Sequence, residues 1–316
     1  MNETLNVEKK IVERLKISDN IHIITHKSPD PDTLGSALAL YHALHSLGKQ
    51  VKIIHDINFS SKYEFLFKDY SDPNFEGKLF VSVDVATPDL LPANSPEVDI
   101  CIDHHINNKI EAELKLVRPE ASATGEIIYD LITMLGININ KNIANCLYAA
   151  IATDTGCFRQ ANTTANSHTI ASKLMNIPGM DYLMITRKFF GFESLKDFKL
   201  KKLFFANAEF FHNKKLVTST ITGEMLKKLE LGSEQIDNGL YSELIKIEGV
   251  CVSAVLRETD DFVKVSFRTN EQYNANEIAG IWNNGGGHKR AGGCIMKCSI
   301  EDAKQSIVNV LAGILL

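Results

Sequence analysis

The chain has 316 residues, of which 44% are hydrophobic and 23% charged, and its formal net charge is −5. These proportions are ordinary for a globular protein and exclude disordered, collagen-like and disulfide-framework classes. The mild acidity also argues against binding of long duplex DNA, because proteins that contact many phosphates usually carry a basic excess. At roughly 100–200 residues per domain, the length favours two domains.

The cysteines and the apolar runs of the sequence indicate in which cellular compartment the protein is expected. Six cysteines occur without a CxxC pair, which predicts reduced thiols in a cytosolic protein. Residues 1–16 carry alternating charge instead of the apolar core of an export signal. No apolar run approaches the ~18 residues that a membrane span requires. We therefore expect a cytoplasmic protein with no membrane partner.

The first half of the chain alternates short apolar runs with helical periods. The predicted strands are residues 21–25, 51–55, 79–85 and 98–102, and the predicted helices are 37–47, 122–135 and 142–152. Strands interleaved with helices indicate an α/β fold with a doubly wound parallel sheet covered on both faces. Ligands of such sheets bind beyond the carboxyl ends of the strands, so the polar residues there are the candidate site.

The second half begins with a charged helical region, residues 164–211, which we interpret as containing a solvated connecting helix. A smaller mixed α/β domain then starts afresh. Its predicted strands are 216–220, 250–257 and 262–268, and its predicted helices are 223–229, 234–247, 276–282 and a last one after Ser299. We expect domains over residues 1–190 and 213–316, joined by 191–212, with a hinge near Phe190–Glu193.

Carboxylates and histidines follow four of the predicted elements. His26, Asp30 and Asp32 follow the first strand as HxxxDxD, Asp84 ends the third, Asp103, His104 and His105 follow the fourth, and Asp154 follows a helix. Singly, such residues are usually caps or turn residues. Together they would repel each other unless a cation neutralised them, and mixed carboxylate and imidazole ligands suit Mn²⁺, Mg²⁺, Fe²⁺ or Co²⁺. The pattern predicts a two-ion centre, a standard device for hydrolysis at phosphorus.

A glycine-rich segment, GGGHKRAGG, runs from Gly285 to Gly293. Residues 278–300 contain three basic residues and no acidic residue. Because glycines let backbone N–H groups approach an oxyanion, the segment predicts a phosphate cradle. A flexible turn before an edge strand is the alternative.

These motifs together resemble the DHH phosphoesterases that carry a C-terminal DHH-associated domain. The HxxxDxD loop, Asp84, the Asp103-His104-His105 triplet, Asp154 in DTGCFR and GGGHKRAGG occur in the family's order and span nearly the whole chain. In length and layout the chain is similar to the NrnA-like nanoRNases, which also act as 3′-phosphoadenosine-5′-phosphate phosphatases. The resemblance implies a DHH catalytic domain over 1–190, a substrate-binding DHH-associated domain over 213–316, and an active site in the cleft between them.

The resemblance also implies roles for the strand-end residues. His26 and Asp30 would bind one Mn²⁺, Asp32, His104 and Asp154 a second, and Asp84 would bridge both, with Mg²⁺ or Co²⁺ as substitutes. A water held between the ions would be the nucleophile. Asp103 would orient the triplet's imidazole, and His105 would contact the scissile phosphate or protonate the leaving oxygen. The family loop reads PDGD, so Pro31 predicts a slight rearrangement of the loop.

The implied substrate contacts lie mainly in the second half. They are His288, Arg268, Gly286, Gly287 and Arg290, with Arg159, Ser122 and Thr124 as weaker candidates. The expected substrates are short single-stranded RNA and a nucleotide bisphosphate, not long duplex nucleic acid. Alternatives on the same centre are linear or cyclic dinucleotides, pyrophosphate or polyphosphate. A regulatory module without catalysis would lack ligands, and all six are present. The chain could also form a homodimer.

Overall fold

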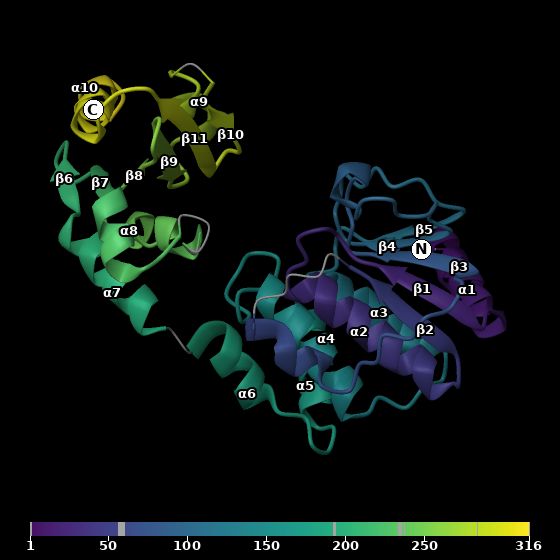
Figure 1. Cartoon of the computed structure of the whole chain (residues 1–316). Helices are drawn as coiled ribbons and strands as arrows, with labels where there is room; N and C mark the ends of the chain where they lie inside the picture. Colours follow the sequence, from purple (N-terminus) through teal and green to yellow (C-terminus); the bar gives the residue numbers. More distant parts are fainter. Residues whose placement is uncertain are drawn as a thin grey trace. The chain divides into compact units, whose positions relative to one another are not determined.

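The computed structural model describes residues 2–55, 61–191, 194–232, 236, 238–282 and 284–315. Two compact units, Met1–Phe192 and Glu193–Leu316, make up the chain and are taken in turn (Figure 1). The predicted hinge includes residues 192 and 193, which lie outside the described residues. No helix in the described part of the chain is long and apolar enough to cross a membrane.

A five-stranded parallel sheet forms the centre of the first unit. Its strands are β1 (Asn20–Ile24), β2 (Gln50–Ile54), β3 (Leu79–Val83), β4 (Ile100–Asp103) and β5 (Leu114–Val117), in the order β2-β1-β3-β4-β5. The predicted parallel sheet is confirmed. β5 escaped prediction because this edge strand has four residues and only Leu116 is buried. The winding reverses between β1 and β3, and ligands bind at such a switch point.

Helices cover one face of this sheet (Figure 1). They are α1 (Asn2–Ile17), α2 (Pro31–Ser46), α3 (Thr124–Met134), α4 (Lys141–Asp154), α5 (Ala165–Met175) and α6 (Tyr182–Thr186). Short turns are η1 (Ser61–Phe67), η2 (Pro88–Leu90) and η3 (Arg187–Gly191). Alternate strand residues such as Ile21 and Val81 join the helical core. On the other face, Cys101 packs with Val85 and Ile110 from the loops. The unpredicted α1 buries Ile11 and Leu15 between its charged residues.

A mixed six-stranded sheet forms the second unit. In chain order the elements are α7 (Leu195–Ala206), β6 (Glu209–Phe211), β7 (Leu216–Ile221), α8 (Gly223–Leu229), η5 (Asn238–Ser242), η6 (Leu244–Lys246), β8 (Val252–Glu258), β9 (Val263–Thr269), α9 (Ala275–Ala279), β10 (Gly286–Gly287), β11 (Ala291–Met296) and α10 (Ile300–Ala312). The sheet order is β10-β11-β9-β8-β7-β6, and only the β7–β8 pair is parallel.

Two segments of the second unit differ from the sequence-based expectations. The predicted helix over 234–247 is wrong in its described part, because residues 238–246 form two short 3₁₀ turns. Asn238 and Gly239 are poor helix formers, and burial of Leu240 and Leu244 decides the local structure. The connecting helix expected within 191–212 is present as α7, but it is not simply solvated, because its Phe204 is fully buried in a core cluster with residues of β7 and β8.

Candidate metal centre

Six predicted ligands meet at the carboxyl edge of the first unit's sheet. His26 follows β1, Asp30 and Asp32 lie at the start of α2, Asp84 follows β3, His104 follows β4, and Asp154 ends α4. Ligand atoms within 4.8 Å of one another form the trios His26–Asp30–Asp84, Asp32–His104–Asp154 and Asp84–His104–His105. The first two trios contain all six residues. Asp84 adjoins both, since its Oδ1 lies 3.8 Å from His104 Nε2.

The loop that carries Asp30 leads directly into helix α2. Asp30 is the N-cap of α2 and accepts a hydrogen bond from the Thr33 N–H at 3.0 Å. Pro31 takes the first position of the helix, where its fixed φ is favourable and its missing N–H is not needed. Asp32 therefore lies in the first helical turn. The proline fits this site because the loop passes directly into a helix.

The N-terminus of α3 holds the buried carboxylate of Asp32. Asp32 accepts hydrogen bonds from the backbone N–H groups of Thr124 at 2.8 Å and Gly125 at 3.1 Å. The hydroxyl of Ser36, one turn along α2, donates to Asp32 Oδ1 at 3.0 Å. Free N–H groups and the helix dipole at an N-terminus favour a negative charge. These contacts fix the carboxylate in place before any ion binds.

Asp84 sits at the sharp turn that follows β3. Its φ is +60°, a left-handed conformation that is uncommon outside glycine, and only 3% of the residue is exposed. Thr33 donates its hydroxyl proton to Oδ2 at 2.6 Å, and Thr124 donates to Oδ1 at 2.8 Å. The sequence expectation of Thr124 as a phosphate contact is therefore wrong, because its hydroxyl is fully buried against Asp84. Such backbone strain is common at functional sites.

The imidazole of His104 is oriented as a ligand would be. Its Nδ1 lies 3.2 Å from the Ala121 carbonyl oxygen, so a proton on Nδ1 leaves the lone pair of Nε2 free. Nε2 lies 3.9, 3.8 and 3.7 Å from oxygens of Asp32, Asp84 and Asp154. A backbone carbonyl that fixes the tautomer is the usual partner of a metal-bound histidine.

The buried carboxylate of Asp103 orients His105. Its buried Oδ1 lies 2.8 Å from His105 Nδ1, and its Oδ2 accepts from Asn108 at 2.6 Å. Burial would raise the pKa of Asp103, but the hydrogen bonds from His105 and Asn108 outweigh it and hold that pKa below its ordinary value. The hydrogen bond to Asp103 in turn raises the pKa of His105. Sequence reasoning missed Asn108, although it follows the triplet closely.

The electrostatics of the edge fit a cation. Burial, together with repulsion from neighbouring carboxylates, raises the pKa values of Asp32 and Asp84 well above the ordinary one. Burial also raises the pKa of Asp154. It lowers the pKa of His26, whose buried Nδ1 has no hydrogen-bond partner among the described residues. A divalent ion would reverse the carboxylate repulsion, and neutral imidazole is the ligand form of histidine. The residues present therefore fit divalent metal.

The turn after Asp154 carries the remaining first-unit candidates. Asn162, which sequence reasoning missed, donates to the Ser122 carbonyl at 2.9 Å and to the Asp154 carbonyl at 3.1 Å. Arg159 is exposed and donates from Nε to the Gly156 carbonyl at 2.8 Å. Ser122 neither caps α3 nor faces solvent, because it donates to the buried Glu126 at 2.5 Å. Asn162 thus ties the end of α4 to the segment that begins α3.

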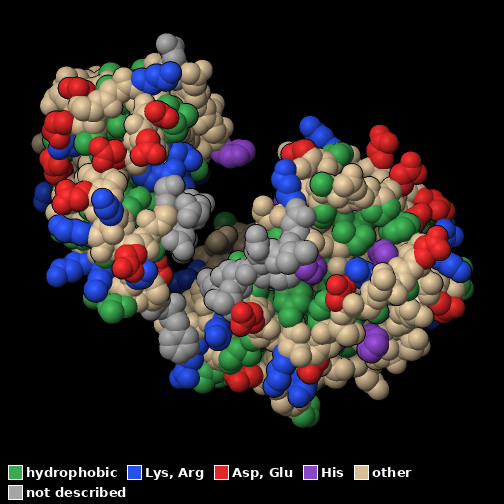
Figure 2. Space-filling model, in the orientation of Figure 1, with side chains coloured by type: hydrophobic (Ala, Val, Ile, Leu, Met, Phe, Trp, Pro, Cys, Tyr) green, Lys and Arg blue, Asp and Glu red, His purple; other side chains and the backbone are tan. Residues whose placement is uncertain are grey.

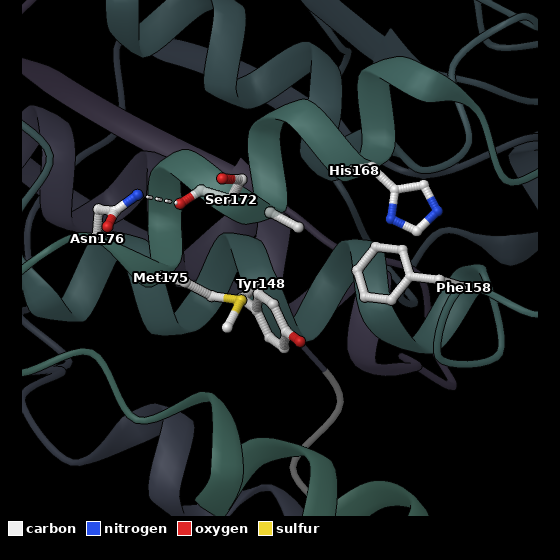
Figure 3. A pocket seen from close by; sticks show the side chains of 7 residues that line it. Tyr148, Phe158, His168, Ser172, Met175 and Asn176 are labelled. Atoms are coloured by element: carbon white, nitrogen blue, oxygen red, sulfur yellow. Dashed lines mark hydrogen bonds between the residues drawn. The ribbon is translucent and has the colours of Figure 1, made fainter.

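A separate pocket of about 440 Å³ lies between α4 and α5 (Figure 3). The rings of Phe158 and His168 stack at one end, with centroids 5.0 Å apart. Tyr148 and Met175 line the other side (Figure 3). None of the six predicted ligands lines it.

The glycine-rich segment of the second unit is a β-hairpin and not an open loop. Gly286 pairs with Gly293, and Gly287 with Gly292, at the edge of the sheet. A Cβ on Gly292 would lie 2.4 Å from the Ala275 carbonyl oxygen of α9, so this position requires glycine. Part of the glycine content therefore serves close packing of α9 against the hairpin.

The basic residues around the hairpin differ in how they are held. Arg290 donates from Nη1 to the carbonyls of Asn270 and Tyr273, which leaves its other donors for further partners. Arg268, on β9, donates from Nε to Ser242 at 3.3 Å, and burial lowers its pKa. His288 is exposed at the hairpin turn. Its side chain has no hydrogen-bond partner in the described ranges.

Comparisons with known proteins agree with the geometry. The model of the DHH family, N-terminal domain, matches residues 20–151, and that of the DHHA1 domain matches residues 219–315. A bifunctional oligoribonuclease and PAP phosphatase NrnA of Thermus thermophilus is 33% identical over 296 residues, 91% of this chain and 87% of the relative. A probable NrnA of the same description from Streptococcus mutans is 30% identical over 96% of this chain and 98% of its own.

A solved structure extends the comparison to the whole fold. The crystal structure of an exopolyphosphatase-related protein from Bacteroides fragilis covers 98% of both chains with a TM-score of 0.83 and 25% identity. The chain therefore belongs to the DHH family, with a DHHA1 domain after the DHH domain, and is an enzyme of the phosphohydrolase class. Within that family it resembles the relatives named NrnA over most of its length.

Proposed function

We propose that the chain is a Mn²⁺-dependent phosphoesterase of short nucleic acid. It hydrolyses oligoribonucleotides of a few residues to mononucleotides, and it dephosphorylates 3′-phosphoadenosine-5′-phosphate to AMP. The observation that carries the proposal is the pair of trios, His26–Asp30–Asp84 and Asp32–His104–Asp154, at one sheet edge. The oligoribonuclease and PAP phosphatase activities for which the NrnA relatives are named support the choice of substrates.

In this proposal the two trios bind two ions. His26 and Asp30 would hold one, Asp32, His104 and Asp154 would hold the other, and Asp84, which adjoins both groups, would serve both ions. The ions would polarise the phosphate and lower the pKa of an attacking water. Carboxylate and imidazole ligands suit Mn²⁺, and Mg²⁺ or Co²⁺ would substitute.

His105 is proposed as the residue that meets the substrate beside this centre. Asp103 accepts from its Nδ1, so the other ring nitrogen is free to donate a hydrogen bond to the scissile phosphate or a proton to the leaving oxygen. Half of the His105 side chain is exposed, which allows such contact. The hydrogen bond to Asp103 raises the pKa of His105, which favours the doubly protonated ring that both roles need.

The second unit is proposed to bind the rest of the substrate. Its candidate contacts are His288, Arg268, Gly286, Gly287 and the free donors of Arg290, and Arg159 is a further candidate on the first unit. A guanidinium binds phosphate bidentately, so Arg268 suits a terminal phosphate. Figure 2 shows acidic and basic side chains interspersed on the visible coloured surface of each unit. This distribution favours a short substrate over long duplex, which needs a broad basic surface.

The proposal is tested on the purified full chain. A diribonucleotide, an RNA of about 24 nucleotides and 3′-phosphoadenosine-5′-phosphate are each incubated with Mn²⁺ or with a chelator, and products are resolved by chromatography. We expect Mn²⁺-dependent hydrolysis of the dinucleotide and the bisphosphate, and much slower attack on the long RNA. The Asp84→Asn variant is the matched inactive control. Lack of metal-dependent product from all three substrates would contradict the proposal.

A second candidate function uses the same centre on inorganic phosphate chains. The structural likeness to the exopolyphosphatase-related protein is the observation that favours it. Pyrophosphate, a short polyphosphate and linear and cyclic dinucleotides therefore join the assay. If kcat/KM for an inorganic substrate exceeds kcat/KM for the dinucleotide and the bisphosphate, the substrate class is inorganic phosphate chains. The proposed metal centre would stand in that case.

A further inference from the structure

Two fully buried threonines contact the two oxygens of Asp84 separately. The Thr33 hydroxyl lies 2.6 Å from Oδ2, and the Thr124 hydroxyl lies 2.8 Å from Oδ1. Both threonines are 0% exposed, so neither can reach a substrate from its place in the structure. Their hydroxyls come from different helices, α2 and α3, and converge on one carboxylate.

Each threonine also contacts a second carboxylate of the centre, and the two contacts fall in different trios. The Thr33 hydroxyl lies 3.1 Å from Asp30 Oδ1, and its N–H donates to the same oxygen at 3.0 Å. The backbone N–H of Thr124 donates to Asp32 Oδ2 at 2.8 Å. Thr33 therefore couples Asp84 to the trio of His26, and Thr124 couples it to the trio of His104.

The carboxylate orientation agrees with this division. Asp84 Oδ1 lies 3.8 Å from His104 Nε2, so Oδ1 is the oxygen turned towards the second trio. An ionised carboxylate has about four lone-pair directions, two on each oxygen. A hydroxyl that occupies one direction on each oxygen leaves one for an ion. A carboxylate without such restraints could rotate and present both oxygens to a single cation, as carboxylates often do.

We propose that Thr33 and Thr124 are positioning residues that divide Asp84 between two divalent ions. Thr33 directs Oδ2 to the ion of His26 and Asp30, and Thr124 directs Oδ1 to the ion of Asp32, His104 and Asp154. The inference rests on the proposed function, because it assumes that the two trios bind ions. It differs from a purely structural role, in which the hydroxyls would only satisfy a buried carboxylate and their loss would not change ion number.

The test counts ions without using activity. Thr33→Val and Thr124→Val remove each hydroxyl at nearly constant volume, and Thr33→Ser and Thr124→Ser keep it. Ser219→Ala is the matched control, since it removes a buried hydroxyl that donates to the Phe204 carbonyl at 2.6 Å in the second unit. Equilibrium dialysis of the full-length variants against Mn²⁺ gives stoichiometry and affinity. Electron paramagnetic resonance separates coupled from isolated Mn²⁺.

The wild type is expected to bind two coupled ions. Each valine variant keeps one ion and binds the second at least about tenfold more weakly, because loss of an orienting partner typically costs about 10–100-fold in metal affinity. The serine variants should bind two coupled ions within about twofold of the wild-type affinity, because they keep the hydroxyl that orients Asp84. Ser219→Ala should do the same, because it lies in the other unit. The double variant Thr33→Val/Asp30→Asn should weaken binding of one ion only, whereas Thr33→Val/Asp154→Asn should weaken binding of both ions.

Distinct results would overturn the inference and the proposed function. Two coupled ions of unchanged affinity in both valine variants would overturn the positioning role and leave the proposed centre intact. A wild type that binds fewer than two ions would contradict the proposed function itself. Thermal unfolding monitors folding of each variant. If a valine variant fails to fold, an alanine variant at that position replaces it as the variant without the hydroxyl. Equal ion binding by the alanine and serine variants would then overturn the inference.

Discussion

The carboxylate edge of the first unit and the glycine-rich hairpin of the second were both predicted as parts of one site, yet their residues are held very differently. At the edge, Asp32 and Asp84 are buried near one another, and their pKa values are raised by burial and mutual repulsion. In the hairpin, Gly292 has a packing role against α9, and Arg290 binds backbone carbonyls. The functional signal is stronger at the edge, because repulsion between its buried carboxylates persists despite their hydrogen bonds.

That difference separates two kinds of evidence. Like charges gathered in a buried site destabilise the protein unless an additional group neutralises them, so their presence points to a ligand. Glycines and arginines can be explained by turns, close approach of backbone and capping of carbonyls. Substitutions at the edge should therefore impair catalysis and metal binding, whereas substitutions in the hairpin should affect both substrate binding and stability.

The largest expected effect comes from Asp84. Asp84→Asn should lower kcat/KM for the dinucleotide at least about a thousandfold, because one carboxylate serves both ions of the hydrolytic centre. Removing a repelled buried charge should not destabilise the metal-free protein. The exposed Asp89→Asn, in the turn after β3, is the matched control and should keep wild-type kinetics. A wild-type kcat/KM in Asp84→Asn would contradict the assignment of catalysis to the carboxylate edge.

Metal-free stability should depend on pH through the same carboxylates. The folded-state pKa values of Asp32 and Asp84 are raised above 3.8. Their contribution to the free energy of unfolding is therefore fully present below pH 3.8 and is lost as the pH rises through the raised values. Urea unfolding should show a larger fall with rising pH in the wild type than in Asp84→Asn. Mn²⁺ at about 100 times its Kd should restore about 2.7 kcal/mol. Identical slopes without metal would contradict the assigned repulsion.

Asp103→Asn should have an intermediate effect. Loss of an orienting carboxylate typically lowers activity about 10–100-fold. Because the hydrogen bond to Asp103 raises the pKa of His105, its loss should move that pKa down towards 6.5 and shift the alkaline limb of the rate profile to lower pH. The measurement is kcat/KM against pH, with His105→Gln as the variant that should lack this limb. An unshifted limb would assign it to another group.

The smallest effects are expected in the hairpin. His288→Ala should raise KM about tenfold with little change in melting temperature, since the side chain is exposed and binds only substrate in this account. Arg290→Ala should raise KM and also destabilise the second unit by about 1–3 kcal/mol, because two carbonyls lose their donor. The exposed Lys227→Ala, on α8, is the control. Unchanged KM in both variants would limit the hairpin to a structural role.

The sequence predicted the outline of the metal edge because its signals are local. The strands that precede His26 and Asp84 are visible as apolar runs followed by polar residues, and parallel strands bring their ends together. Thr33 and Asn108 escaped prediction because hydroxyl and amide side chains have many uses, and only packing shows which carboxylate they meet. The placement of Asp32 inside α2 was missed because Pro31 reads equally as an extended loop or a helix start.

The second unit shows the opposite limit. Its strands β8 and β9 match the strands predicted over 250–257 and 262–268. The helix predicted over 234–247 was wrong where it is described, since burial of Leu244 outweighed the helical period. The packing role of Gly292 depends on α9 approaching the hairpin, which no local pattern encodes. Tertiary contacts thus decide what the composition leaves open.

Anomalous diffraction from crystals of the wild-type protein grown with Mn²⁺ would show directly whether the sheet edge binds two ions. We expect two peaks about 3.5–4 Å apart at the carboxyl edge of the first unit's sheet. One peak should contact His26 and Asp30, the other Asp32, His104 and Asp154, with Asp84 between them. A single peak at this edge, or Mn²⁺ bound only elsewhere, would contradict the two-ion centre.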